Sequence, residues 1–370
     1  MQRFDGQPLG NQPHLAVLFQ DKLGGFVVAT PLLRGLKEKY PSAVLDYFGG
    51  DRTEQLETAC PYIDARYSLY GSTESIRSLG EYVRRREQEA GPYDLAINLD
   101  NNPLNALVTG ALSPRFVVGR SFLPDGRGEF PPGDTLLDTI QDPSTFWSAD
   151  DFMSRYGEVV HTNFIGEIFC RLARVDTDFQ KTEVATAEVP FVVPTVLIAT
   201  GATRRAKLWP VTSWKRWLER CDAENITVGL LGAAPGVQAA AYRSGTVDAE
   251  LLACSRLVDL RGRLTLPEVA GALRQARVCV TIDTGVMHLA AAVGTPTLAL
   301  FGASSWDLWA PRVPWLHLVL PTEPCPMCHD NHFLNDACLR DRHVCMLSIS
   351  PDSVFNATRV LLLQSVAENG

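Results

Sequence analysis

The chain has 370 residues, more than one hydrophobic core usually holds, so we expect two domains. Apolar residues at 46% and charged residues at 21% are typical of a globular protein and exclude a disordered chain. The 34 basic residues are outnumbered by 42 acidic ones, and this net charge of −8 argues against nucleic acid as a partner.

No targeting or membrane segment is expected. The first residues, MQRFDGQPLGNQPH, contain no basic stretch followed by an apolar one, so they do not form a secretory signal. The apolar region 278–302 is interrupted by Asp283, His288 and Pro296, which argues against a membrane span. We therefore expect a cytoplasmic protein without a transmembrane anchor.

Strand and helix patterns alternate along the first half of the chain. Helices are predicted over 27–40, 75–90 and 157–175, and strands over 14–20, 43–48, 65–70, 94–100 and 115–122. Strands separated by helices indicate parallel pairing with right-handed crossovers, as in a Rossmann-like unit.

The second half repeats this alternation after a linker at 184–194. Helices are predicted to begin near Ser213, Gly236, Leu266 and Thr284, and strands to cover 195–202, 227–233, 257–262, 278–283 and 297–303. A last helix is predicted over 350–368. Two such units in series leave a cleft between the carboxyl ends of their sheets, where ligands of open α/β sheets bind.

Polar residues interrupt the apolar stretch TIDTGVMHLAAAVGTPTLALFG, residues 281–302. Thr284 and Gly285 stand where a strand turns into a helix, whose first N–H groups favour an anion such as phosphate. His288 follows about one helical turn later, and Asp283 has two interpretations: the N-cap of the helix, or a hydrogen-bond acceptor for a ligand.

A second loop, ATGATRRAKLWPVTSWKRW at 199–217, also follows a predicted strand. It holds Thr200, Gly201 and Thr203, with a basic cluster that includes Lys207. This cluster is either a solvated basic loop or a binding site for a pyrophosphate. The glycine pair Gly24-Gly25 lacks the full dinucleotide-binding spacing, so a nicotinamide site is disfavoured.

Three segments together resemble glycosyltransferase family 9, the ADP-heptose heptosyltransferases. They are VVATPLLRGLKEKYP (27–41), KLWPVTSWKRWL (207–218) and DTGVMHLAAAVGTPTLALFGASSWDLWAP (283–311). The resemblance implies an α/β protein with the GT-B fold, two Rossmann-like domains facing across a cleft. The expected domains are 1–180 for the acceptor and 190–349 for the nucleotide-sugar donor, with the C-terminal helix 350–370 joining the first domain.

The resemblance also implies roles for the loop residues of the donor domain. Lys207 would neutralise the donor phosphates, Thr284 and Gly285 would bind them, and His288 would support them. Asp283 would hold the sugar, with contributions expected from Thr200, Gly201 and Thr203. No metal is implied at the transfer centre.

The catalytic base is where the chain departs from the family. The lipopolysaccharide enzymes carry an aspartate after the glycine of the first loop, and this chain has Gly25 there, next to Gly24. A carboxylate near the acceptor hydroxyl would still be useful. Asp21 and Asp100 are the candidates, and Asp100 is favoured because it ends a predicted strand beside Asn101 and Asn102, which we expect to contact the acceptor. The alternative role of Asp100 is to cap its loop.

Four cysteines, Cys325, Cys328, Cys338 and Cys345, lie within 21 residues. Their spacing suits a tetrahedral site for structural iron or zinc, with disulfides as the alternative. His329, His332 and His343 are possible substitute ligands. The cluster resembles the four-cysteine iron finger of autotransporter heptosyltransferases, a protein-modifying branch of the family.

These observations predict an inverting glycosyltransferase that transfers a heptose, most simply from ADP-heptose. The acceptor would be a protein, a small metabolite or a lipopolysaccharide core. A GT-B sugar-nucleotide epimerase and a non-catalytic sugar-nucleotide binding module are the alternatives.

Overall fold

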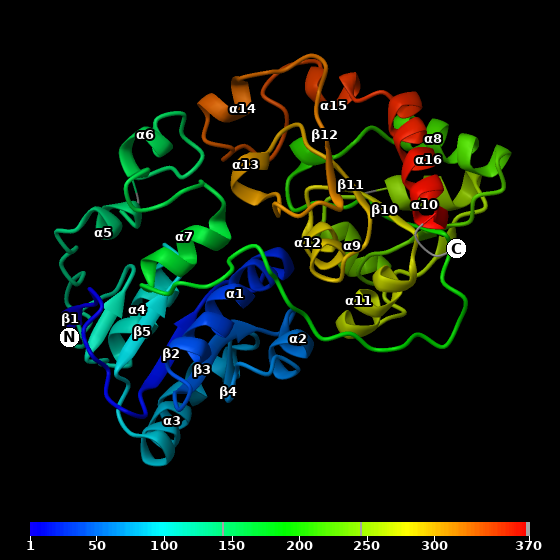
Figure 1. Ribbon diagram of the computed structural model, residues 1–370. Helices are drawn as coiled ribbons and strands as arrows, with labels where there is room; N and C mark the ends of the chain where they lie inside the picture. The colour runs from blue at the N-terminus through cyan, green and yellow to red at the C-terminus, as the bar shows by residue number, and fades with distance from the viewer. Residues whose placement is uncertain (143, 245, 368–370) are drawn as a thin grey trace. The chain divides into compact units, whose positions relative to one another are not determined.

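The computed structural model describes residues 1–142, 144–244 and 246–367. The chain divides into two compact units, Met1–Glu183 and Val184–Gly370 (Figure 1). This boundary falls in the segment predicted as a linker. Each unit is built around its own parallel sheet.

The sheet of the first unit has six strands in the described part of the chain, in the order β1-β6-β5-β2-β3-β4. The strands are β1 (Gln2–Arg3), β2 (His14–Leu18), β3 (Val44–Gly50), β4 (Ala65–Tyr70), β5 (Leu95–Asn98) and β6 (Phe116–Val118), and neighbouring strands pair in parallel. The central strands β2 and β5 are buried along their whole length, as the short apolar runs of a sheet covered on both faces require.

The helices of this unit agree with the predictions over 27–40 and 75–90, and four further helices among the described residues were not predicted. They are α1 (Leu23–Lys39), α2 (Glu54–Thr58), α3 (Thr73–Ala90), α4 (Pro103–Ala111), α5 (Leu136–Ile140), α6 (Phe152–Tyr156) and α7 (Ile165–Leu172). The prediction of one helix over 157–175 is wrong, because residues 157–164 are not helical. The buried Glu167 carboxylate accepts hydrogen bonds from the backbone N–H groups of His161 and Thr162, both at 2.8 Å, and so holds this turn before α7 begins.

The second unit repeats the design, with six described strands in the order β12-β11-β10-β7-β8-β9. They are β7 (Val196–Ala199), β8 (Val228–Leu230), β9 (Val258–Asp259), β10 (Val278–Ile282), β11 (Thr297–Leu300) and β12 (Leu316–Val319), again in parallel ladders. Counted from β7 in chain order, this is the 3-2-1-4-5-6 arrangement of Rossmann sheets. The sequence analysis did not predict β1 or β12, both of which are edge strands.

The helices of the second unit begin close to the predicted positions. They are α8 (Val211–Ala223), α9 (Pro235–Ala241), α10 (Val247–Cys254), α11 (Leu266–Gln275), α12 (Gly285–Ala292), α13 (Trp306–Trp309), α14 (Met327–Asp330), α15 (Val344–Ser348) and α16 (Pro351–Ala367), with a 3-10 turn η1 (Arg205–Lys207).

The C-terminal helix was expected to join the first domain, but α16 belongs to the second unit. It packs against α8, β10 and β11 (Figure 1). Val354 and Phe355 are fully buried in the core of this unit, and the Trp217 indole donates to the Thr358 hydroxyl at 3.3 Å. The apolar spacing of the helix therefore serves this core. Residues 368–370 lie outside the described part of the chain.

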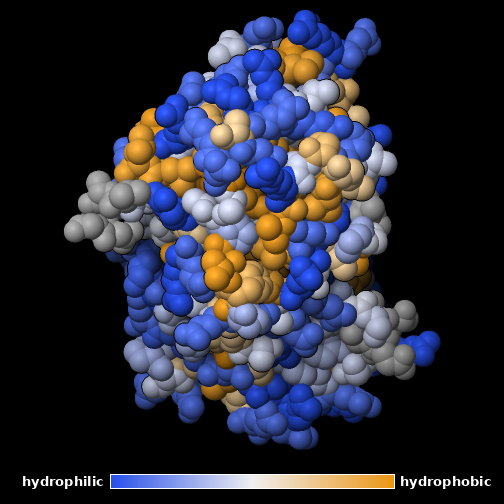
Figure 2. Space-filling model, turned by 90° about the vertical axis from the view of Figure 1, so that its right-hand side faces the viewer, coloured by the Kyte–Doolittle hydropathy of each residue, from blue (hydrophilic) through white to orange (hydrophobic). Residues whose placement is uncertain are grey.

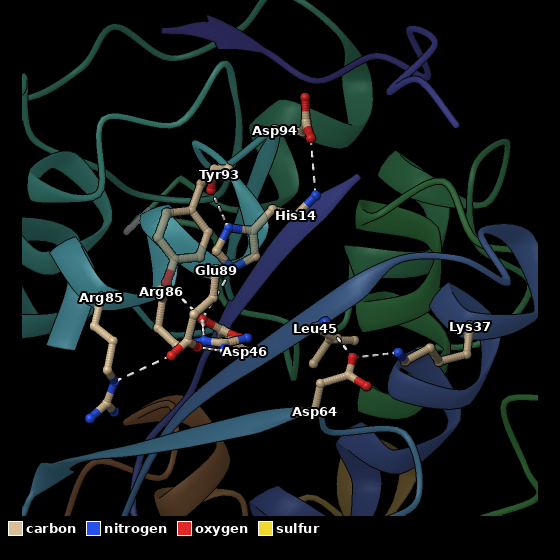
Figure 3. Close-up of polar contacts among 11 residues, drawn as sticks. His14, Lys37, Leu45, Asp46, Asp64, Arg85, Arg86, Glu89, Tyr93 and Asp94 are labelled. Carbon is tan, nitrogen blue, oxygen red and sulfur yellow. Dashed lines mark hydrogen bonds and ion pairs between the residues drawn. The ribbon is translucent and has the colours of Figure 1, made fainter. Parts of the chain in front are cut away.

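A buried polar network lies near the N-terminal ends of the strands of the first sheet (Figure 3). The Asp46 carboxylate contacts His14 Nε2 at 3.1 Å, the Tyr93 hydroxyl at 2.8 Å and the Arg86 guanidinium at 2.8 Å. Burial alone would raise the pKa of Asp46, but hydrogen bonds from these three side chains lower it. The network is a structural clamp between β2, β3 and α3.

The surface of the protein mixes apolar and polar residues, and Figure 2 shows apolar patches among hydrophilic side chains on one face. Such mixing is ordinary, since polar atoms are too few to cover a folded chain. None of the helices in the described ranges combines the length and hydropathy needed to cross a membrane.

Candidate functional site

In each sheet the chain adds successive strands first on one side of a central strand and then on its other side. These switch points lie between β2 and β5 in the first unit and between β7 and β10 in the second. Ligands of open α/β sheets bind at the carboxyl ends of the strands at such points. The predicted site residues Asp21, Asp100, Thr200 and Asp283 all follow one of these four strands.

Lys207 and Asp283 meet at the switch point of the second unit. Lys207 Nζ lies 2.5 Å from Asp283 Oδ2, and the Asp283 side chain is only 5% exposed. Burial would raise the pKa of Asp283, but the charge and hydrogen bond of Lys207, with His288 and a Ser304 hydrogen bond, lower it. Asp283 is therefore ionised, and it holds the ammonium of Lys207 in place.

Thr284, and not Asp283, is the N-cap residue of α12, and no side chain caps this helix. The N-cap interpretation of Asp283 is thus not the arrangement found. The first N–H groups of α12, beginning at Gly285, have no side-chain acceptor and carry the positive end of the helix dipole. Together with the Lys207 ammonium, they make this corner attractive to an anion.

His288 is buried behind this corner. Its ring is 2% exposed and lies edge-on to Trp309, with 6.4 Å between ring centroids. Burial lowers the pKa of His288 to about 4, although the charge of Asp283 opposes this shift. His288 is therefore neutral near pH 7, and its Nδ1 has no hydrogen-bond partner among the described residues.

The loop after β7 holds the other predicted donor residues. The buried Thr200 hydroxyl donates to Asp248 Oδ1 at 2.5 Å, so its hydrogen atom is already used inside the unit. A Cβ atom at Gly201 would lie 2.4 Å from Gln238 Nε2, the far end of a flexible side chain that packs closely against this loop. Thr203 is exposed, and its side chain is open to solvent.

Two carboxylates lie near Tyr70 at the switch point of the first unit. Burial raises the pKa of Tyr70 to about 12, and the charges of Asp100 and Asp21 both add to this shift. Asp100 Oδ1 accepts from the Asn102 N–H at 3.1 Å, whereas its buried Oδ2 has no partner in the described part of the chain. Asp100 thus caps its loop with one oxygen, and its other, buried oxygen has no hydrogen bond among the described residues.

Asp21 is held more tightly than Asp100. Its Oδ1 accepts from the Arg52 N–H at 2.9 Å and from the Thr53 hydroxyl at 3.3 Å. Burial raises the pKa of Asp21, and these hydrogen bonds and the Arg52 charge oppose that shift only in part.

Of the two asparagines predicted to contact the acceptor, one is exposed to solvent and the other is hydrogen-bonded within the chain. Asn101 is exposed. The Asn102 side chain is occupied, since its Oδ1 caps α4 by accepting from the Asn105 N–H and its Nδ2 donates to the Tyr70 hydroxyl at 2.6 Å.

Gly24 and Gly25 lie in the first turn of α1. A Cβ atom at Gly25 would lie 2.4 Å from Cε1 of Phe19, a buried ring packed edge-on against Phe169. The space that an aspartate side chain would need at this position is filled by Phe19.

The four clustered cysteines are all free thiols, so the disulfide alternative is not formed. Cys328 and Cys345 are buried, and Cys325 and Cys338 are partly exposed. Burial, with smaller contributions from the other three thiols, raises the pKa of Cys345 to about 11. Across the described ranges, no group of three or more His, Cys, Asp or Glu side chains is arranged to hold a metal ion.

The sequence analysis missed two residues near these switch points, Ser304 and Tyr70. Ser304 hydrogen-bonds Asp283 and follows β11, so the rule about strand carboxyl ends could have found it. Tyr70 ends β4 and reaches α4 only in the folded chain. Arg204 was placed in the basic cluster, but its guanidinium donates to backbone carbonyls.

Both the family comparison and the similar proteins point to heptosyltransferases. The model of the family "Glycosyltransferase family 9 (heptosyltransferase)" matches residues 170–335. Lipopolysaccharide heptosyltransferase 3 of Escherichia coli is 22% identical over 304 residues, which cover 78% of this chain and 83% of that protein.

Solved structures match over nearly the whole chain. E. coli ADP-heptose lipopolysaccharide heptosyltransferase II superposes with a TM-score of 0.67 at 18% identity, covering 95% of this chain and 99% of that one. The iron-containing dodecameric glycosyltransferase TibC of enterotoxigenic E. coli H10407 gives a TM-score of 0.56 at 16% identity, with 97% and 80% covered. These neighbours establish the GT-B fold, and the family match over residues 170–335 together with the heptosyltransferase relatives supports a glycosyltransferase similar to those of family 9.

Proposed function

We propose that this enzyme transfers a heptose from ADP-heptose to an acceptor hydroxyl, with inversion at the anomeric carbon. The observation that carries the proposal is the Lys207 ammonium, held 2.5 Å from Asp283 beside the uncapped N-terminus of α12. This is the charge arrangement that a leaving diphosphate requires. The similar proteins are heptosyltransferases, and we therefore propose heptose as the transferred sugar.

The donor phosphates would bind between Lys207 and the first turn of α12. An ammonium has three donors, so Lys207 can keep its contact with Asp283 while it donates to a phosphate oxygen. The N–H groups at Gly285 and the exposed Thr203 hydroxyl would complete this shell. Thr200, Gly201 and His288 would shape the loop around it, and Asp283 would position Lys207 in addition to any contact with the sugar.

In the transfer step the acceptor oxygen attacks the anomeric carbon, and the bond between that carbon and the diphosphate oxygen breaks. The proton of the acceptor hydroxyl passes to a carboxylate, and the negative charge that develops on the diphosphate is stabilised by Lys207 and α12. Asp100 is the proposed base because its Oδ2 is free to take a proton. Asp21, whose oxygen is held by Arg52 and Thr53, is the second candidate.

The four-cysteine segment is proposed to bind one structural iron or zinc ion through Cys325, Cys328, Cys338 and Cys345. Soft thiolate ligands suit either metal, and the four thiols lie within 21 residues of one another. Metal analysis of reduced wild-type protein and of Cys328→Ser is the test. One equivalent of metal in the wild type that is lost in the variant supports the site, and protein without metal in both samples contradicts it.

The decisive experiment is incubation with ADP-heptose, with and without acceptors, followed by measurement of ADP release and of the glycosylated product. The acceptor arms are a lipopolysaccharide core, a protein with exposed hydroxyls and a small hydroxylated metabolite. Acceptor-dependent ADP release supports transfer. ADP release without any acceptor would instead indicate an epimerase-like elimination, and binding without release would indicate a non-catalytic binding module.

Lys207→Ala is the matched variant for the donor site, with Lys215→Ala as its control. Lys215 lies on the neighbouring helix α8 and pairs with Glu250 on the protein surface. We expect weaker ADP binding by about tenfold or more for Lys207→Ala, because a charge-assisted contact to phosphate is lost. Unchanged binding in Lys207→Ala would contradict the assignment of the donor site.

A further inference from the structure

Arg204 precedes the turn that carries Lys207, and its guanidinium donates hydrogen bonds to backbone carbonyls of other loops. Nη1 donates to the carbonyl oxygens of Phe333 and Asn335, the latter at 3.1 Å, and Nη2 donates to the carbonyl oxygen of Ala303. These carbonyls belong to the cysteine-rich segment 325–345 and to the loop after β11. One side chain therefore joins three loops that are far apart in sequence.

A second set of contacts fixes the same turn from the other side. The Asp336 carbonyl accepts from the Ala206 N–H at 2.8 Å, whereas the ion pair between the Asp336 carboxylate and Arg205 Nε lies exposed on the surface and adds little to this support. Beneath them lies a small apolar cluster of Ala206, Ala303, Cys328 and Phe333. The backbone on which Lys207 stands is thus held by the cysteine-rich segment.

Lysine is a flexible point charge, so its usefulness at a phosphate depends on where its backbone is fixed. The same network reaches the other partner of Lys207. Ala303, whose carbonyl binds Arg204, directly precedes Ser304, which hydrogen-bonds Asp283. Both members of the Lys207–Asp283 pair are therefore supported by loops that converge on Arg204.

We propose that Arg204 is a positioning residue through which the cysteine-rich segment sets the affinity of Lys207 for a nucleoside diphosphate. The inference rests on the proposed donor site, and it assigns to this segment a role in ligand binding in addition to any role in metal binding. Arg204 itself does not contact the ligand.

The first test compares the affinity for ADP, measured by calorimetry, in the wild type, Arg204→Ala, Arg204→Lys and Arg205→Ala. We expect the dissociation constant to rise by about tenfold in Arg204→Ala, with partial rescue in Arg204→Lys, whose ammonium can still reach a carbonyl. Arg205→Ala removes only an ion pair whose side chains are 63% and 41% exposed, so we expect a change of less than about twofold.

The second test uses reciprocity, because a segment that controls ADP binding must itself be stabilised by ADP. In the wild type, ADP should slow hydrogen exchange of the amides at 328–337 as well as those at 204–207 and 284–287. In Lys207→Ala, the effect on 328–337 should disappear. This measurement needs no Arg204 variant, so it remains informative if Arg204→Ala does not fold.

The outcomes separate the inference from the proposed function. If ADP fails to bind the wild type, both are overturned. If ADP binds the wild type and Arg204→Ala with equal affinity, or leaves exchange at 328–337 unchanged, the proposed function stands and the positioning role of Arg204 is overturned. A loss of stability in Arg204→Ala without a change in affinity would indicate a purely structural residue.

Discussion

Asp100 and Asp21 differ in how each carboxylate is held, and this difference ranks them as bases. Asp100 keeps one buried oxygen without a partner among the described residues, whereas Asp21 is hydrogen-bonded by Arg52 and Thr53. A base needs a lone pair that points to the acceptor, so geometry favours Asp100. Burial raises the pKa of Asp21, and this keeps Asp21 as the second candidate.

We expect Asp100→Asn to lower kcat by about 100-fold or more, because an amide cannot accept the proton, while ADP affinity stays within about twofold. Asp21→Asn should lower kcat by less than about tenfold. Transfer rates and ADP binding of the two variants check this ranking. The reverse order of effects would transfer the role to Asp21.

The tight packing around Gly25 leads to a prediction about stability. A Cβ atom there would lie 2.4 Å from the buried Phe19 ring, so Gly25→Ala should destabilise the first unit by about 1–3 kcal/mol through overpacking. Gly80→Ala is the matched control: it lies in α3 with nothing within 4 Å, and it should stabilise by about 0.5–1 kcal/mol. Denaturant unfolding followed by circular dichroism measures both, and equal stabilities would show that Phe19 moves aside freely.

At the scale of elements, the break between α6 and α7 shows how a single carboxylate overrides helix periodicity. Glu167 is fully buried and accepts from two backbone N–H groups and from the Thr162 hydroxyl. The periodic apolar residues of 157–175 predicted a continuous helix, but that pattern does not show that the Glu167 carboxylate binds the N–H groups of His161 and Thr162. A buried carboxylate needs hydrogen-bond donors, and here a turn supplies them.

Glu167→Ala removes the acceptor of two backbone N–H groups and of the Thr162 hydroxyl, and we expect a loss of about 1–3 kcal/mol in the free energy of unfolding. Glu167→Gln keeps one acceptor oxygen and should lose less. Hydrogen exchange of the amides at 161 and 162 localises the effect. An alanine variant as stable as the wild type would mean that water replaces the carboxylate.

At the scale of the whole molecule, two compact units with separate cores are expected to respond differently to pH. His288 belongs to the second unit, and its pKa falls from 6.5 to about 4 on burial. Below pH 6.5 the unfolded chain binds a proton at this position and the folded chain does not. Protonation therefore favours the unfolded state, and stability is lost as the pH falls from 6.5 to about 4.

This group alone predicts a loss on the order of 3 kcal/mol for the second unit across that window. Tryptophan fluorescence reports mainly on this unit, because Trp147 is the only one of the seven tryptophans before residue 184. His288→Gln, which cannot titrate, should flatten the dependence between pH 6.5 and 4. An unchanged slope in the variant would show that another group is responsible.

The sequence by itself determined the alternation of strands and helices, the two-unit organisation and the loops at the strand ends, because these follow from local hydrophobic periodicity and turn residues. It also placed Lys207 and Asp283 in the second unit's candidate site. Only the tertiary structure decided that these two side chains pair, that Arg204 faces backbone carbonyls, that α16 completes the second core and that Phe19 fills the space beside Gly25. Each of these depends on contacts between segments far apart in the chain, and a local pattern does not encode which distant atoms will meet.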